Sequence, residues 1–257
     1  MMKSSAFSIG RANLTVYLLA ALGFPVILSA QAADSGPNTN ATKFPHTMSA
    51  VSWRKPAGEW VTAESVALDR ADASKFVIQP GEGVLVNGPK GRSVDLLTSQ
   101  EFGDVQLYIE FCIPKQSNSG VYLMGRYEVQ IYDSYGVAND KYPGIECGGI
   151  YPRWTADRNE FEGHSPHANV SKPPGQWQSF EITFRAPRFD QAGKKTANAR
   201  FVKVVHNGHV VHENIEVTGP TRAAHFEDEA VSGPLLLQGD HGPVAFRNLK
   251  VTEVKLD

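Results

Sequence analysis

Three polar side chains at every second position of one short segment could together do acid–base chemistry. Arg126, Glu128 and Gln130 alternate with apolar residues in the run RYEVQIYD. Alternate residues of a strand point to opposite faces, so these three share a face while their neighbours enter the core. A carboxylate can take a proton, a guanidinium can hold a developing negative charge, and an amide can bind a hydroxyl. The strand alone nevertheless favours a solvated face.

A second polar group follows near the C-terminus, in the run LQGDHG. Gln238, Asp240 and His241 stand at a turn between glycines, where a histidine is often only a turn residue. Here the adjacent carboxylate of Asp240 could orient the imidazole or raise its pKa. Glu128, Asp240 and His241 would also suit a hard divalent metal ion with oxygen and nitrogen ligands, so a metal cofactor stays open.

A rival chemistry needs only two carboxyl groups. In DVQLYIEFCI, Glu110 lies on the face opposite the apolar set, and Cys112 beside it is small. An ordinary glycosidase holds its two carboxyl groups about 5–9 Å apart. Glu110 and Glu128 would meet that requirement if their strands were neighbours.

Short strands separated by turn residues must position these groups. Val105, Leu107, Ile109 and Phe111 alternate with polar residues, and WQSFEITFRA alternates in the same way. Asn207-Gly208 is the preferred type I′ pair between two β-rich runs, and it predicts a hairpin with His206 and His209 exposed near its tip. The connection over residues 139–175 is long, which is typical of a functional segment. No helical periodicity of useful length occurs outside the N-terminus, so we expect a single all-β domain, a sandwich of two antiparallel sheets.

The N-terminus has the pattern of a secretory signal. Lys3 and Arg11 precede an apolar run that ends in an A-x-A motif at residues 30–32. We expect a signal peptide over residues 1–32, a flexible leader over 33–50, a domain over 51–257, and an exported, periplasmic protein with no further membrane span. Cleavage leaves 23 basic and 27 acidic residues, a net charge of −4. Without basic runs, nucleic acid is not an expected partner.

The mature chain has two cysteines, Cys112 and Cys147. An exported protein meets an oxidising compartment, which favours a disulfide between them. Two separate buried thiols are the alternative.

Several longer segments resemble one known family. The runs LLTSQEFGDVQLYIEFCIP, NSGVYLMGRYEVQIYDSYG, CGGIYP and GPLLLQGDHGPVAFRNLKV, among others, occur in the order of the 3-keto-disaccharide hydrolases, from about Leu96 to Val251. That family acts on 3-keto-glycosides and is also described as 3-keto-glucoside lyases or hydratases. The resemblance implies a concanavalin-like jelly-roll sandwich with the pocket on the Arg126–Glu128–Gln130 face.

The resemblance also implies a reaction and a set of residues for it. A ketone at C3 makes the C2 hydrogen acidic, so a base can start β-elimination of the C1 oxygen, and water can then add. Glu128 or His241 would be the base, and Arg126 or His241 would hold the enolate. The expected substrate-binding residues are Gln130, Asp133, Tyr151, Gln238, Asp240 and Glu110. The alternative is a non-catalytic carbohydrate-binding domain. The aromatic rings of Trp154 and Tyr151, which could stack on a sugar ring, favour this alternative.

Overall fold

The computed structural model describes residues 46–47, 51–55, 58–139 and 146–257. All of them belong to one compact unit, whose regular elements are strands only. The signal peptide expected over residues 1–32 lies outside the described residues. So does the leader expected over residues 33–50, apart from His46–Thr47, which forms strand β1.

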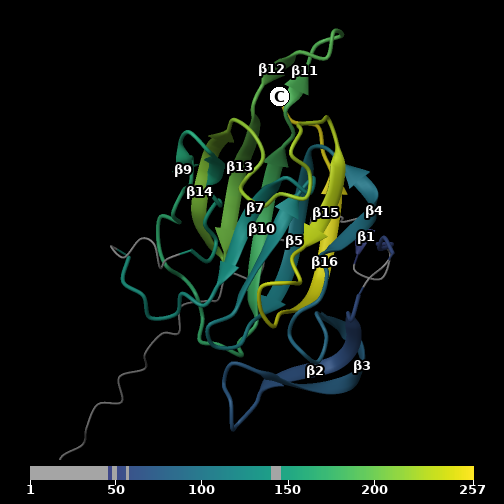
Figure 1. Ribbon diagram of the computed structural model, residues 1–257, viewed down its shortest axis with the longest axis vertical. Coiled ribbons are helices and arrows are strands. Elements are labelled where there is room, and N and C mark those ends of the chain that lie inside the picture. The colour runs from purple at the N-terminus through teal and green to yellow at the C-terminus, as the bar shows by residue number, and fades with distance from the viewer. Residues whose placement is uncertain (1–45, 48–50, 56–57, 140–145) are drawn as a thin grey trace, which may run out of the picture. The chain divides into compact units, whose positions relative to one another are not determined.

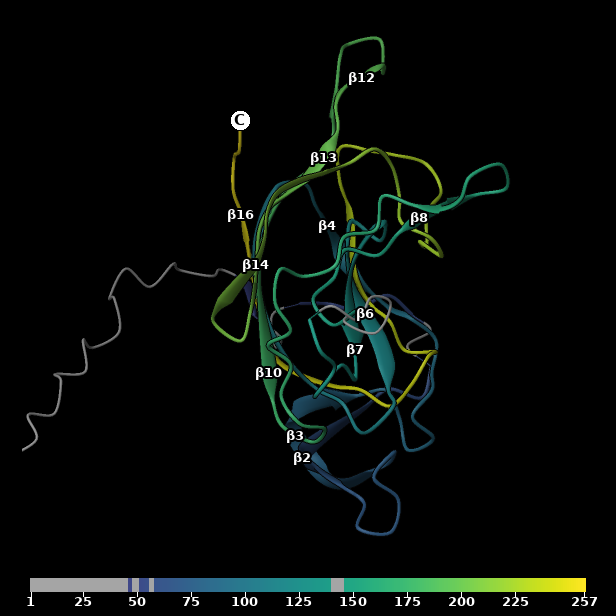
Figure 2. The same ribbon diagram turned by 90° about the vertical axis from the view of Figure 1, so that its left-hand side faces the viewer.

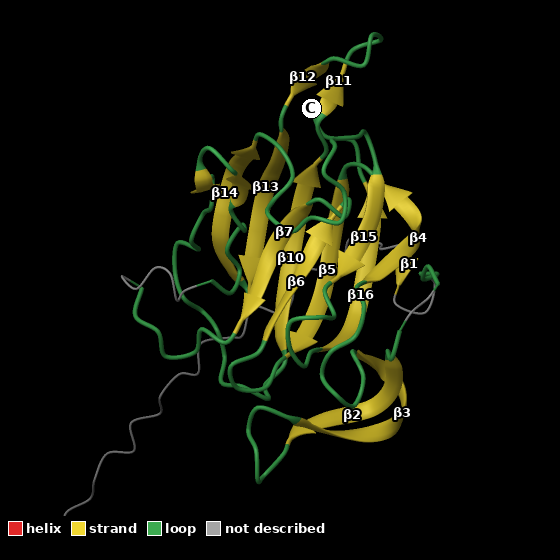
Figure 3. Ribbon diagram, in the orientation of Figure 1, coloured by secondary structure: helices red, strands yellow, loops and turns green. Residues whose placement is uncertain are grey.

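Two antiparallel sheets form the two layers of this unit, which confirms the predicted sandwich (Figures 1 and 3). The larger sheet has the order β14 (His209–Val217), β13 (Ala199–His206), β10 (Gln178–Arg185), β5 (Val105–Cys112), β16 (Ala245–Glu253), β3 (Phe76–Val86) and β2 (Val61–Leu68), and β1 pairs with β16. The smaller sheet has the order β4 (Leu96–Phe102), β15 (Gly233–Leu237), β6 (Asn118–Leu123) and β7 (Tyr127–Tyr132). Figure 2 shows the two layers from the side, with β10, β13 and β14 in one and β6 and β7 in the other.

The core lies between the sheets and follows the predicted alternation. Val105, Leu107, Ile109 and Phe111 of β5 are all buried in it. Burying apolar surface contributes about 25 cal/mol per Å², so the inward residues of both sheets hold the layers together. A strand face that points away from this core needs another reason to be buried.

The Asn207-Gly208 turn forms as predicted. Asn207 and Gly208 have φ of 51° and 81°, as a type I′ turn requires, and they join β13 to β14. The expected exposure of His206 is wrong, because its side chain is fully buried between the sheets. Opposite β10, the register of β13 slips by one residue between Phe201 and Lys203, and this irregularity sets which later residues face the core.

Two small hairpins stand apart from the main sheets. β8 (Arg153–Thr155) pairs with β9 (Asn159–Phe161) within the long connection, and β11 (Arg188–Phe189) pairs with β12 (Lys195–Ala197). Within the described residues, no helix is long and apolar enough to cross a bilayer.

Candidate active site

The outer face of the smaller sheet carries the polar residues of the strand pattern. On β7, Val129 and Ile131 point into the core, while Glu128 and Gln130 point outward. The exposed fractions of Glu128 and Gln130 are nevertheless only 2% and 3%. This face is therefore buried rather than solvated, contrary to what the strand pattern alone favours. A buried carboxylate is costly, which makes Glu128 the natural centre of a functional site.

Part of the long connection, residues 146–151, runs along the free edge of β7. Gly148 N donates to Gln130 O at 2.8 Å, and Tyr151 N donates to Glu128 O at 3.1 Å. These bonds continue the sheet beyond its edge strand. They also bring Tyr151 close to Glu128. Burial raises the pKa of the Tyr151 hydroxyl, and the negative charge of Glu128 raises it further.

The Glu128 carboxylate lies over Gly120 on the neighbouring strand β6. A Cβ atom on Gly120 would stand 2.1 Å from Glu128 Oε1, so only glycine leaves this space open. With its nitrogen turned toward acceptors, the Gln130 amide donates to the same Oε1 at 2.7 Å and to Ser119 O at 3.0 Å. Tyr122, directly opposite in the strand register, makes a further polar contact with the carboxylate. Glu128 is thus held in one position by its neighbours.

Burial raises the pKa of Glu128 to about 8. The negative charges of Asp95, Asp240 and Glu146 add to this rise, because each disfavours a further negative charge nearby. A general base works best when its pKa lies near the working pH. Glu128 therefore has the pKa of a base that can take and return a proton at neutral or slightly basic pH.

This raised pKa makes stability depend on pH. The folded state holds the Glu128 proton more tightly than the unfolded chain, whose pKa is close to 4.5. Its contribution to stability is therefore present at low pH and is lost as the pH rises from about 4.5 to about 8. In urea titrations across this range, we expect Glu128→Gln to remove a decline of a few kcal/mol in the free energy of unfolding. Glu181→Gln, which changes an exposed carboxylate on β10, should keep the wild-type decline. An equal slope in wild type and Glu128→Gln would contradict the raised pKa.

Asp95 joins the site from the residue before β4, and the sequence pattern gave no sign of it. Its Oδ1 accepts from Gly239 N at 2.9 Å, next to the turn of Asp240 and His241. Burial raises its pKa, and the charge of Asp240 raises it further. Asp95 is therefore a candidate acid beside a candidate base.

Asp240 and His241 form the rim of the site. The Asp240 carboxylate is hydrogen-bonded to His241 Nδ1, and both side chains are about half exposed. A pocket of 710 Å³ opens at this point, and Asp95 and Asp240 belong to its lining together with Arg54 and Arg92. The acidic cluster around Glu128 thus borders a space large enough for a sugar.

Gln238 lies between the rim and Glu128. Its backbone N donates to Gly120 O at 3.0 Å, and its Nε2 is 3.4 Å from the Tyr122 hydroxyl. Its Oε1 is buried and has no hydrogen-bond partner among the described residues. A buried acceptor without a partner is costly, so Gln238 is ready to accept a hydrogen bond from a substrate hydroxyl.

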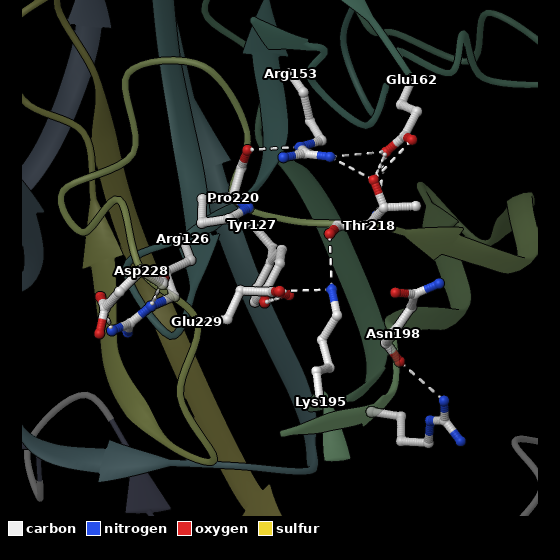
Figure 4. Close-up of polar contacts among 11 residues, drawn as sticks. Arg126, Tyr127, Arg153, Glu162, Lys195, Asn198, Thr218, Pro220, Asp228 and Glu229 are labelled. Carbon is white, nitrogen blue, oxygen red and sulfur yellow. Dashed lines mark hydrogen bonds and ion pairs between the residues drawn. The ribbon is translucent and has the colours of Figure 1, made fainter. Parts of the chain in front are cut away.

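Arg126 lies in the turn before β7 and is engaged by the protein itself. Its Nε and Nη2 donate to the backbone oxygen and the carboxylate of Asp228, each at 2.7 Å (Figure 4). Its Nη1 donates to Met124 O at 2.9 Å. The guanidinium also lies 4.6 Å from the centre of the Phe226 ring. These contacts favour a structural role over the predicted role at an enolate.

We accordingly expect Arg126→Gln to act on stability. The change removes a buried, multiply hydrogen-bonded cation, which costs about 2–4 kcal/mol in the free energy of unfolding. Urea denaturation followed by tryptophan fluorescence measures this loss. An unchanged unfolding midpoint combined with lost activity would instead return Arg126 to the catalytic set.

Glu110 lies on the other sheet. Its carboxylate accepts from Arg247 Nε at 2.6 Å, Asn248 Nδ2 at 3.0 Å and the Tyr108 hydroxyl at 2.8 Å. Its strand β5 belongs to the larger sheet and is not a neighbour of β7, so the core separates the two outer faces. The condition for a Glu110–Glu128 glycosidase pair is therefore not met.

Asp133 lies at the end of β7, where it holds a turn. Its Oδ2 accepts from Gln116 N at 2.9 Å, and Gln116 has the unusual φ of 61°. The structure thus gathers Glu128, Gln130 and Gln238 in one place and gives Asp133 a contact with the backbone at the edge.

The sequence left open a metal ion bound by Glu128, Asp240 and His241. Among residues 46–47, 51–55, 58–139 and 146–257, no three His, Cys, Asp or Glu side chains form a group that could hold a metal ion. Glu128, Asp240 and His241 therefore do not fit as a ligand set, and we derive no step through a metal.

The predicted disulfide between Cys112 and Cys147 is wrong. Both are free and buried. Cys112 belongs to a small apolar cluster with Val86 and Ala245, whereas Cys147 lies in the main core, with its Sγ 4.0 Å from His206 Nε2. Burial raises the pKa of each thiol to about 12, so both are unreactive thiols.

Comparison with known proteins now adds the family. The profile of the 3-keto-alpha-glucoside-1,2-lyase-like domain matches residues 46–252. The chain belongs to this family. Its 3-keto-alpha-glucoside-1,2-lyase-like domain thus includes every residue of the site and both sheets apart from Glu253, the last residue of β16. Comparison with curated proteins yields no match.

Two solved structures resemble this chain. One candidate glycosyl hydrolase from Parabacteroides distasonis is 28% identical over 76% of this chain and 79% of its own, with a TM-score of 0.53. A second from the same organism is 20% identical over 76% of this chain and 99% of its own, with a TM-score of 0.47. The first likeness and the family together support a carbohydrate-active domain with this β-sandwich fold.

Proposed function

We propose that this protein cleaves the glycosidic bond of 3-keto-glycosides, with Glu128 as the base that removes the C2 proton. The observation that carries the proposal is a buried carboxylate with a pKa of about 8, on which the charges of two pocket-lining residues, Asp95 and Asp240, act. Membership in the 3-keto-alpha-glucoside-1,2-lyase-like family supports the substrate class.

The chemistry balances with the groups at hand. Glu128 takes the proton from C2, and the electron pair moves toward C3, placing negative charge on the C3 oxygen. The His241 imidazole, which the Asp240 carboxylate orients, donates a hydrogen bond to that oxygen. The charge then returns to form the C1–C2 double bond, the C1 oxygen leaves, and Asp95 gives it a proton. Addition of water across the double bond completes a net hydrolysis.

The neighbouring residues hold the sugar and the base. Gln238 Oε1 accepts from a sugar hydroxyl, and the Tyr151 hydroxyl binds another. Gln130 fixes the carboxylate of Glu128 in the orientation that the reaction needs. We further infer export, because the first 32 residues have the pattern of a signal peptide.

The direct test is turnover with matched sugars. The purified protein is incubated with a 3-keto-disaccharide and with its unoxidised parent, each with and without a chelator. We expect release of the second sugar from the 3-keto compound only. Equal release from the parent disaccharide would contradict the proposal.

A further inference from the structure

A second pocket lies beside the β8 strand, which begins two residues after Tyr151. It has a volume of 470 Å³ and is lined by residues 153–156 of the β8 strand and its turn, by residues 220–224, and by Glu227. Trp154 belongs to this lining and is 49% exposed. Tryptophan has a large apolar side chain that is usually buried, so an indole ring exposed in a pocket is unusual.

The walls of this pocket are held in place by other contacts. Arg153 donates to Pro220 O at 3.4 Å and to the Thr218 hydroxyl, and it lies 3.7 Å from the Glu162 carboxylate (Figure 4). Arg222 N donates to Pro152 O at 2.7 Å, which joins the second wall to the chain directly after Tyr151. The pocket is therefore preformed, and one of its walls begins two residues after Tyr151.

Two features of the lining are unusual. Thr155 Oγ1 is buried and has no hydrogen-bond partner among the described residues. Ala223 has a φ of 60°, a left-handed conformation that costs a residue with a side chain about 1–2 kcal/mol. The turn that Ala224 N closes onto Thr221 O at 3.2 Å accounts for the conformation of Ala223. The unpartnered hydroxyl of Thr155 is therefore the feature that points to a ligand.

The chemistry of the lining selects the ligand. Arg153 is paired with Glu162 and Arg222 with Glu160, so neither guanidinium offers an unpaired charge to a phosphate. What remains is a flat apolar ring beside polar groups that can exchange hydrogen bonds. A sugar ring matches it, because it has an apolar C–H face and hydroxyls at its edge.

We propose that this pocket binds an additional sugar unit of an oligosaccharide, with its ring stacked on Trp154 and a hydroxyl donating to Thr155. The proposal deepens the proposed function, since the extra sugar would belong to the same substrate. It predicts that the protein acts on, or is retained on, chains longer than a disaccharide.

Calorimetry with unoxidised sugars tests this pocket without relying on turnover. The probes are hexasaccharides of glucose with α-1,4, β-1,4 or β-1,3 linkages. We expect wild type to bind at least one of them and Trp154→Ala to bind it about ten-fold more weakly. Tyr135→Ala, which removes a 55% exposed ring elsewhere, should bind as wild type does. Thr155→Val, tested as a second variant, should weaken binding by about three- to ten-fold.

The outcomes separate the two proposals. No binding of any probe by wild type, or equal binding by wild type, Trp154→Ala and Thr155→Val, would overturn the sugar pocket. Turnover of a 3-keto-disaccharide by the same wild-type preparation reports on the Glu128 site alone. Binding without turnover would sustain the pocket and refute the proposed function, and turnover without binding would do the reverse.

Discussion

Glu128→Gln is expected to lower kcat for a 3-keto-disaccharide by about 10³-fold or more. Glutamine has nearly the same shape but cannot take the C2 proton, and loss of a general base costs about 10²–10⁴-fold. The side chain is buried, and burial raises the pKa of its carboxylate to about 8, so a neutral amide should fit without loss of stability. Steady-state kinetics, with the thermal midpoint measured on the same sample, give both quantities.

Glu181→Gln is the matched control for this variant, because it makes the same chemical change on an exposed strand position. It should keep wild-type kcat. Full turnover by Glu128→Gln would remove Glu128 from the role of base and leave His241 as the remaining candidate.

Gly120→Ala is expected to lower kcat/KM by about 10²-fold with little change in stability. The new Cβ would stand 2.1 Å from Glu128 Oε1 and 2.9 Å from its Cδ, so the flexible carboxylate must move away. A displacement of about 1 Å at a catalytic group costs about 10²-fold in rate. In a strand, alanine replaces glycine at a gain of roughly 0.5–1 kcal/mol, which offsets part of the local crowding.

A double variant shows whether this loss acts through Glu128. Glu128→Asp shortens the side chain and should lower activity on its own. In the Gly120→Ala background, Glu128→Asp should lower kcat/KM by a much smaller factor than it does in wild type. The reason is that the shorter carboxylate no longer meets the new methyl group. Additive losses would mean that Gly120 acts through something other than the position of Glu128.

Sequence reasoning could predict the sandwich because alternation is a local property. The alternating residues of β5 and of β10 predict a strand from that segment alone, and the Asn207-Gly208 pair predicts its turn in the same way. The same alternation placed Glu128 and Gln130 together on one face. It could not report that this face is buried, because the segment that pairs with β7 lies further along the chain and has no alternating pattern.

The rest of the site depends on which strands meet. Asp95 reaches Glu128 only because β4 and β15 pair within the smaller sheet, and Glu110 is distant only because β5 belongs to the larger one. The separation of Cys112 from Cys147 has the same cause. The prediction that His206 is exposed was wrong for a different reason. The register of β13 slips by one residue between Phe201 and Lys203, which turns His206 toward the core, and an alternating pattern alone does not reveal such a slip.

The most direct test of the central claim follows the hydrogen at C2. A 3-keto-disaccharide carrying deuterium at C2 is turned over in ordinary water, and the deuterium content of the released keto-sugar is measured by mass spectrometry. Removal of the C2 proton by Glu128 predicts that the deuterium is lost from the product and that kcat/KM is lower for the labelled substrate. Cleavage with full retention of the deuterium and no isotope effect would contradict the account, since the bond would then break without proton removal at C2.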